Sequence, residues 1–164
     1  MRKILILLGA VTILAAGCGS DSSTTSSSGT PVQLAGSTTN KGTKDVSGTS
    51  VDVELNDYSF TPTFLKGGSP GSTITVHLKN AGRQPHTFTS AALHADKQLG
   101  PGESADVQVT LPQSGASEFH CTFHQQSNGM QGAFFFKDGD TVAAGAAPSG
   151  GKTTTTAGGG YYGN

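Results

Sequence analysis

The chain has 164 residues, of which 34% are hydrophobic, 10 are Lys or Arg and 11 are Asp or Glu, giving a formal net charge of −1. A protein that binds nucleic acid through its phosphates needs clustered basic side chains, so this balance argues against that class. The length allows one modest domain with additional segments outside it.

The N-terminus has the pattern of an export signal. Met1–Lys3 carries positive charge, and a short apolar run over Ile4–Ala16 follows it. This run is shorter than the roughly 20 residues of a membrane-spanning helix. We therefore expect residues 1–17 to be a secretory signal peptide rather than a permanent transmembrane anchor.

The end of this signal bears on how the protein is attached. The segment Leu14–Cys18 resembles a bacterial lipoprotein signal, in which cleavage precedes the cysteine and the sulfur is lipidated. The resemblance implies a lipid anchor on Cys18 and a place on the outer face of the cytoplasmic membrane. The usual leucine lies three residues before the cysteine, whereas Leu14 lies four before. The alternative is an ordinary signal cut near Ala16, which would release the protein to the periplasm or the outside.

Composition then divides the rest of the chain. Residues 18–50 and 138–164 are rich in Ser, Thr, Gly and Ala and contain few apolar side chains that could form a core. Such composition predicts a flexible linker and a disordered tail. The folded domain is therefore expected over residues 51–137, a size that can bury one core.

Within this domain the hydrophobic period is two, which predicts half-buried strands. Alternation is clear over Val51–Leu55, Ile74–Leu78 and Ala105–Leu111. Further extended runs are predicted at Tyr58–Leu65, His86–Ser90, Ser117–Phe123 and Gly132–Phe136. About seven short strands in this length predict an all-β sandwich, and only Ala91–Lys97 is a candidate for a turn or two of helix.

One strand-loop-strand segment carries the candidate chemistry. Cys121 is followed three residues later by His124 and nine residues later by Met130. A thiolate, an imidazole and a thioether form a soft ligand set that suits both Cu(I) and Cu(II). His86, which follows Pro85 at the start of a predicted strand, is the best second imidazole. Lipidation of Cys18 would leave Cys121 without a disulfide partner, and metal ligation would protect the exported thiol.

These residues resemble the cupredoxin family, particularly its plastocyanin-like and pseudoazurin-like members. Asn80–His86 is similar to the family's first-histidine segment, and Cys121–Gly132 is similar to its Cys-x-x-His-loop-Met-x-Gly segment. The resemblance implies a Greek-key β-sandwich with one type 1 copper ion. It implies these copper ligands: His86, Cys121, His124 and Met130. The backbone N–H of Thr87 is expected to bond the cysteine sulfur.

Two departures from the family pattern leave the details of the ligand set open. The loop between His124 and Met130 is one residue longer than in plastocyanin-like members, so Met130 has competitors as the axial ligand in Gln125, Gln126 and Gln131. Thr87 stands where the family often has Asn.

The other three histidines are weaker ligand candidates. His77 lies on the polar face of a predicted strand and His94 lies in a loop, so we expect both to be solvated. His120 adjoins Cys121 and points to the opposite face. There it is either an exposed strand histidine or, as the resemblance implies, part of an electron-entry site.

The expected function is that of a monomeric type 1 copper protein. It would shuttle single electrons between a transient donor and a transient acceptor protein and would not be an enzyme. The main alternative is an exported copper-binding or copper-delivery protein. Nucleophilic catalysis by Cys121 fits poorly, because no orienting partner or oxyanion hole is evident.

Overall fold

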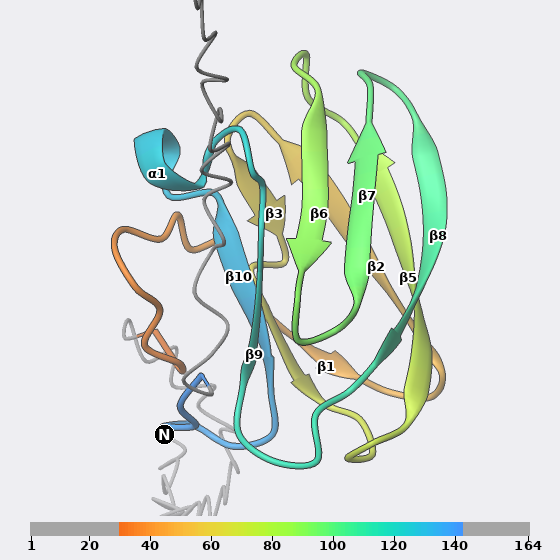
Figure 1. Ribbon diagram of the computed structural model, residues 1–164, viewed down its shortest axis with the longest axis vertical. Helices are drawn as coiled ribbons and strands as arrows, with labels where there is room; N and C mark the ends of the chain where they lie inside the picture. Colours follow the sequence, from red (N-terminus) through yellow and green to blue (C-terminus); the bar gives the residue numbers. More distant parts are fainter. Residues whose placement is uncertain (1–29, 143–164) are drawn as a thin grey trace, which may run out of the picture.

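The computed structural model describes residues 30–142, which form two β-sheets packed face to face (Figure 1). One sheet has the order β1 (Thr43–Val46), β4 (Phe64–Gly67), β10 (Gln131–Phe135), β9 (Ser117–His120), β6 (His86–Ser90) and β7 (Ala95–Leu99). The other has the order β3 (Ser59–Thr61), β2 (Ser50–Asn56), β5 (Thr73–Asn80) and β8 (Ser104–Thr110). One short helix, α1 (Gln125–Asn128), lies in the same range. The all-β sandwich expected from the sequence is confirmed.

Several sequence-based expectations fall outside this range. The export signal, Cys18, the first part of the linker and the end of the tail all lie beyond the described residues. Among residues 30–142, no helix is both long enough and apolar enough to cross a bilayer.

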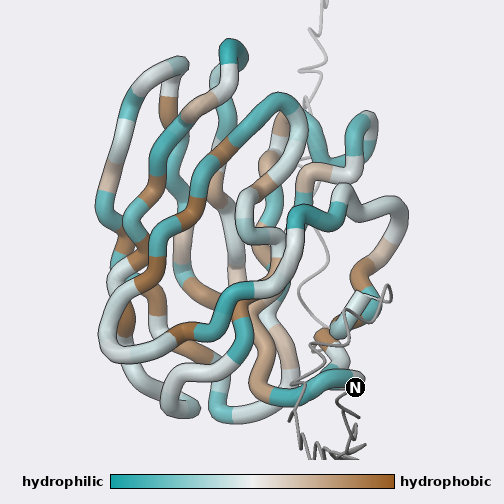
Figure 2. The backbone as a smooth tube through the Cα atoms, turned by 180° about the vertical axis from the view of Figure 1, so that it is seen from behind, coloured by the Kyte–Doolittle hydropathy of each residue, from teal (hydrophilic) through white to brown (hydrophobic). Residues whose placement is uncertain are grey.

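Alternating side chains explain how the two sheets meet. In β2, Val51, Val53 and Leu55 are buried while the intervening Asp52 and Glu54 are exposed. Successive strand residues point to opposite faces, so one face of β2 is apolar. The same alternation is visible along the neighbouring strands (Figure 2). The apolar faces of the two sheets therefore form one core between them.

Four buried phenylalanines form the centre of this core. The ring centroid of Phe119 lies 5.1 Å from that of Phe60, 4.8 Å from that of Phe88 and 5.7 Å from that of Phe134. Edge and tilted arrangements of this kind stabilise beyond the area that they bury. Phe88 belongs to β6 and Phe119 to β9, so the cluster joins these two neighbouring strands.

Two predicted segments differ in the structure. The run Tyr58–Leu65 is divided into β3 and β4, which belong to different sheets, and Pro62 lies at the break, where it removes a backbone donor. Residues 91–94 form only a turn, and residues 95–97 already belong to β7. Pairing with β6 along the whole of β7 outweighs the weak local preference for helix.

The expected linker and tail also need correction near the domain. Residues 30–50 pack against the sandwich and include β1, because Val32 and Val46 are both buried. At the other end, Asp140 is buried and accepts the backbone N–H groups of Phe136 and Lys137. The folded unit therefore extends from about residue 30 to residue 142.

Residues 30–42, which we call the N-terminal strap, run along β10 towards α1 (Figure 1). The Gly139 N–H donates to the Pro31 carbonyl near one end of the sandwich. Near the other end, the Thr39 N–H donates to the Gly129 carbonyl over 3.1 Å. The strap thus connects the lower edge of the sandwich to the loop that follows α1.

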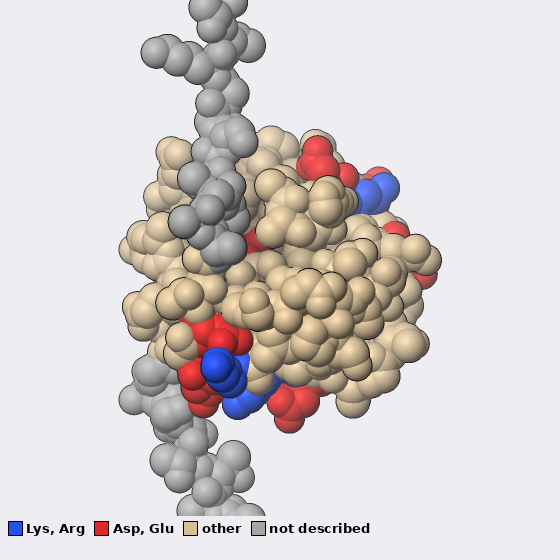
Figure 3. Space-filling view, turned by 60° about the horizontal axis from the view of Figure 1, so that its bottom comes forward, with Lys and Arg blue, Asp and Glu red and all other residues tan. Residues whose placement is uncertain are grey.

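Charged side chains form small groups of both signs on the face shown in Figure 3. Two ion pairs of the described residues are Lys66 with Asp138, 2.9 Å apart, and Lys44 with Asp52, 3.4 Å apart. All four side chains are solvent-exposed, so each pair contributes little to stability.

Truncating Phe119 should test the aromatic core. Phe119→Ala would leave a cavity among three other rings, so we expect the free energy of unfolding to fall by about 3–5 kcal/mol. Urea denaturation of the metal-free protein measures this. Phe123→Ala is the matched control, because Phe123 is 50% exposed and should lose well under about 1 kcal/mol. Equal losses in the two variants would contradict this account of the core.

Gly129 should test the contact with the strap. Its φ is +65°, and an added Cβ would lie 2.6 Å from the Ser37 carbonyl oxygen. Gly129→Ala should therefore destabilise the protein by about 1–3 kcal/mol more than Gly102→Ala, where φ is +79° but the space is open. Hydrogen exchange of the Thr39 amide should also become faster. Equal stability losses, with unchanged Thr39 exchange, would show that the strap is not held at Gly129.

Candidate metal centre

The three predicted donor residues of the trigonal set come together at one end of the sandwich, beside α1 (Figure 1). His86 is the first residue of β6, Cys121 directly follows β9, and His124 directly precedes α1. β6 and β9 pair through Thr89 and His120. This pairing places the start of β6 beside the end of β9.

The donor atoms form a small triangle. The two Nδ1 atoms of His86 and His124 are 3.1 Å apart, and the Cys121 Sγ lies 3.8 Å and 3.4 Å from them, respectively. An ion equidistant from the three would lie about 2 Å from each, close to metal–imidazole and metal–thiolate bond lengths. His86 and Cys121 are fully buried, while His124 is partly exposed. These three residues therefore fit a metal ion that prefers trigonal coordination.

Hydrogen bonding orients the ring of His86. Its Nε2 lies 2.8 Å from the Asp57 Oδ1. The Arg83 backbone N–H, and then the His86 ring, hold the pKa of Asp57 below its ordinary value, so this carboxyl is ionised at neutral pH. An ionised carboxylate only accepts, so Nε2 carries the proton and Nδ1 presents its lone pair to the triangle.

Thr87 joins the two ligand segments. Its backbone N–H donates to the Cys121 Sγ over 3.3 Å, as the sequence predicts. Its hydroxyl accepts the Thr122 N–H over 2.9 Å. Thr87 therefore binds Thr122, the residue after the cysteine, at a position where the family often has Asn. A threonine hydroxyl makes fewer hydrogen bonds than an asparagine amide.

Met130 is fully buried in the same core cluster as Cys121, and its carbonyl accepts the Cys121 N–H over 3.0 Å. The competing glutamines are engaged elsewhere or exposed. The Gln131 amide donates to the carbonyls of the strap and accepts from the Gln125 amide, while Gln126 faces solvent. Met130 therefore stays the preferred candidate for the fourth ligand.

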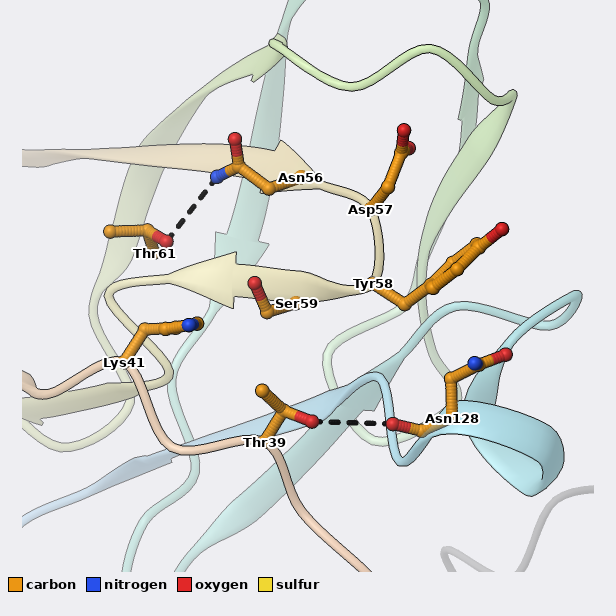
Figure 4. Close-up of a pocket in the computed structure, with 8 residues that line it drawn as sticks. All are labelled: Thr39, Lys41, Asn56, Asp57, Tyr58, Ser59, Thr61 and Asn128. Carbon is orange, nitrogen blue, oxygen red and sulfur yellow. Dashed lines mark hydrogen bonds between the residues drawn. The ribbon is translucent and has the colours of Figure 1, made fainter.

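The turn between β2 and β3 supplies residues that sequence reasoning did not find. Asp57 bonds His86, and the Tyr58 ring lies 4.5 Å from the His124 ring between centroids. Both residues also border a cavity of about 520 Å³ between this turn and the strap, with Asn128 on its far side (Figure 4). The sequence indicates a turn near Asp57, but not that the turn meets the ligand loops.

The other histidines lie outside the donor cluster. His77 Nδ1 lies 2.7 Å from the Asp106 Oδ1 on the outer face of β5, and His94 is exposed. His120 is only 12% exposed and lies 3.5 Å from the Glu118 carboxylate, so the expectation of an exposed strand histidine is wrong. β9 is an inner strand of its sheet, and His120 lies between Gln131 of β10 and Thr89 of β6. Among the described residues, the three donors above form the one group of His, Cys and acidic side chains with metal-binding spacing.

The pKa values of two histidines should be displaced in opposite directions. Burial, and then the neighbouring His86, lower the pKa of His124 below 6.5, whereas the Asp106 hydrogen bond raises that of His77 above 6.5. NMR titration of the metal-free protein should show both displacements. Because unfolded His124 binds its proton at higher pH, its contribution to stability should be complete above pH 6.5 and decline as the pH falls below it. If the titration midpoint of His124 lay at a higher pH than that of His77, the result would contradict the burial of the site.

The sequence matches the family model of the cupredoxin-like domain over residues 31–134. No curated protein matches the chain in sequence.

Solved structures that align with the chain include two auracyanins. One, from the photosynthetic bacterium Roseiflexus castenholzii, is 22% identical, with 56% of this chain and 98% of that chain covered and a TM-score of 0.45. The other is auracyanin A, a "blue" copper protein of Chloroflexus aurantiacus, which is 19% identical, with 57% and 100% covered and a TM-score of 0.44.

A third aligned structure is the metal-binding domain of the Cu(I)-exporting P-type ATPase of Streptococcus pneumoniae. It is 12% identical, with 62% of this chain and 97% of that chain covered and a TM-score of 0.49. The family match alone covers more than half of the sequence. The chain therefore belongs to the cupredoxin-like domain family, and its His86, Cys121 and His124 form a type 1 copper-like site, with the buried Met130 as the expected fourth ligand.

Proposed function

We propose that the protein is an electron carrier that accepts one electron from a donor protein and passes it to an acceptor protein. The observation that carries this proposal is the closed donor triangle of two imidazoles and one buried cysteine sulfur on a β-scaffold. Bound copper supplies a one-electron redox couple. The ligands suit both oxidation states, so little has to rearrange when an electron moves.

The scaffold supports this role by holding the ligands fixed. Phe88 and Phe119, each two residues from a ligand, pack ring against ring in the core. The Thr87 N–H fixes the position of the Cys121 sulfur. Ligands held in this way move little between the two oxidation states, so reorganisation during transfer is small.

The route for electrons is proposed to pass through His124. This histidine is the partly exposed member of the triangle, and its neighbour Phe123 is 50% exposed. Among the described residues, Phe123 is the exposed large hydrophobic side chain. An apolar contact beside an exposed ligand edge suits brief docking with a redox partner, since such interfaces are small.

The cellular setting belongs to the same proposal. Export through residues 1–17 and a lipid on Cys18 would hold the protein, as a monomer, at the outer face of the membrane. The redox partners would meet it there, in the periplasm or the surrounding medium.

Two other functions have less support. A delivery protein must surrender its metal, yet His86 and Cys121 are fully enclosed. A copper oxidase or reductase needs a further ligand cluster, and the described residues offer the one described above.

The absorption spectrum of the protein without its export signal, loaded with one equivalent of Cu(II), should test the proposal. We expect an intense visible thiolate-to-copper band that reductant bleaches and oxidant restores. Cys121→Ser should abolish the band. His94→Asn should retain it, because His94 is exposed and Asn tolerates its positive φ of 53°. Tight Cu(I) binding without such a band would instead favour copper delivery.

A further inference from the structure

The β2–β3 turn presents a carboxylate to the first copper ligand. Asp57 Oδ1 lies 2.8 Å from the His86 Nε2, on the side of the ring opposite the donor triangle. Its Oδ2 accepts the Arg83 backbone N–H over 2.9 Å, and its Oδ1 also accepts that of Gln84 over 3.3 Å. The carboxylate is thus bound to the His86 ring and to the backbone two and three residues before it.

The loop before His86 is shaped to admit this carboxylate. A Cβ on Gly82 would collide with the Asp57 Oδ1 and lie 3.0 Å from the His86 Nε2. The buried Asn80 holds the loop in place, because its side-chain amide donates to the backbone carbonyls of Gln84 and Leu99. The loop backbone therefore leaves a space between Gly82 and the His86 ring, and the Asp57 carboxylate occupies this space.

No basic side chain offsets the charge of Asp57 within the described part of the chain. Its side-chain hydrogen-bond partner there is the His86 ring, and the nearby Arg83 contributes only its backbone N–H. The Asp57 side chain is 27% exposed, so solvent screens the charge only in part. The negative charge consequently acts on the imidazole and, through it, on any cation bound at Nδ1.

We infer that Asp57 is a positioning residue for the copper site, which selects the ligating tautomer of His86 and biases the site towards Cu(II) over Cu(I). This inference rests on the proposed function. A hydrogen bond from Nε2–H to a carboxylate increases the electron density at Nδ1, and a nearby negative charge stabilises a doubly charged ion more than a singly charged one. Asp57 thereby sets the reduction potential lower than a neutral residue would.

Two substitutions separate orientation from charge. Asp57→Asn keeps an oxygen that can accept the Nε2–H but removes the charge, whereas Asp57→Ala removes both. Asp52→Asn is the matched control, because it deletes one exposed carboxylate of β2 that bonds Lys44 rather than the metal site. All variants are made in the chain without its export signal.

The first readout needs no copper. ¹⁵N-resolved NMR of the metal-free protein should show the His86 Nε2–H tautomer in the original protein, in Asp57→Asn and in Asp52→Asn, and a mixture of tautomers in Asp57→Ala. The same His86 tautomer in all four proteins would overturn the orienting role.

The second readout is the ratio of Cu(II) to Cu(I) affinity. Asp57→Asn should lower this ratio about tenfold relative to Asp52→Asn, which corresponds to a potential about 59 mV higher. Asp57→Ala should also weaken Cu(II) binding by about 10–100-fold. Ratios equal to that of Asp52→Asn would overturn the charge effect.

The two readouts also keep this inference apart from the proposed function. If the original protein bound copper without a blue band, electron transfer would fail as its function. The tautomer in Asp57→Ala would still decide the orienting role of Asp57, with a mixture supporting it and an unchanged tautomer overturning it.

Discussion

The pairing of β6 with β9 at Thr89 and His120 is the constraint on which the metal centre depends. Side chains two apart on a strand share a face, so His86 follows the orientation of Phe88, and Cys121 follows that of Phe119. The rings of these two phenylalanines lie 4.8 Å apart between centroids and hold the strands in this register. A slip of one strand by one residue would place the two ligands on opposite faces of the sheet.

The sequence predicts the parts of the site that lie close together along the chain. Cys121, His124 and Met130 are recognisable because one short segment carries all three donor types. His86 is found because a proline and a strand pattern surround it. The contact between Asp57 and His86 could not be predicted in this way, because 29 residues separate them and only the packing of the β2–β3 turn brings them together.

The strands also divide into those that a local sequence pattern predicts and those that only distant contacts place. β2, β5 and β8 carry strict alternation, and the sequence predicts all three. β7 has three exposed residues in succession, so no period is visible, and its pairing with β6 alone makes it a strand. β1 and the strap have few apolar residues. Their placement depends on isolated valines and on backbone hydrogen bonds to distant segments, which composition does not reveal.

The course of the strap has a geometric consequence for how the molecule can be mounted. The described chain begins near the lower edge in Figure 1, where Pro31 bonds Gly139, while His124 lies at the end that carries α1. The start of the folded unit and the copper ligands therefore lie apart along the long axis of the sandwich. A support joined at residue 30, whether a surface, a fused protein or an electrode, would hold the molecule by its base and leave the redox end pointing outward.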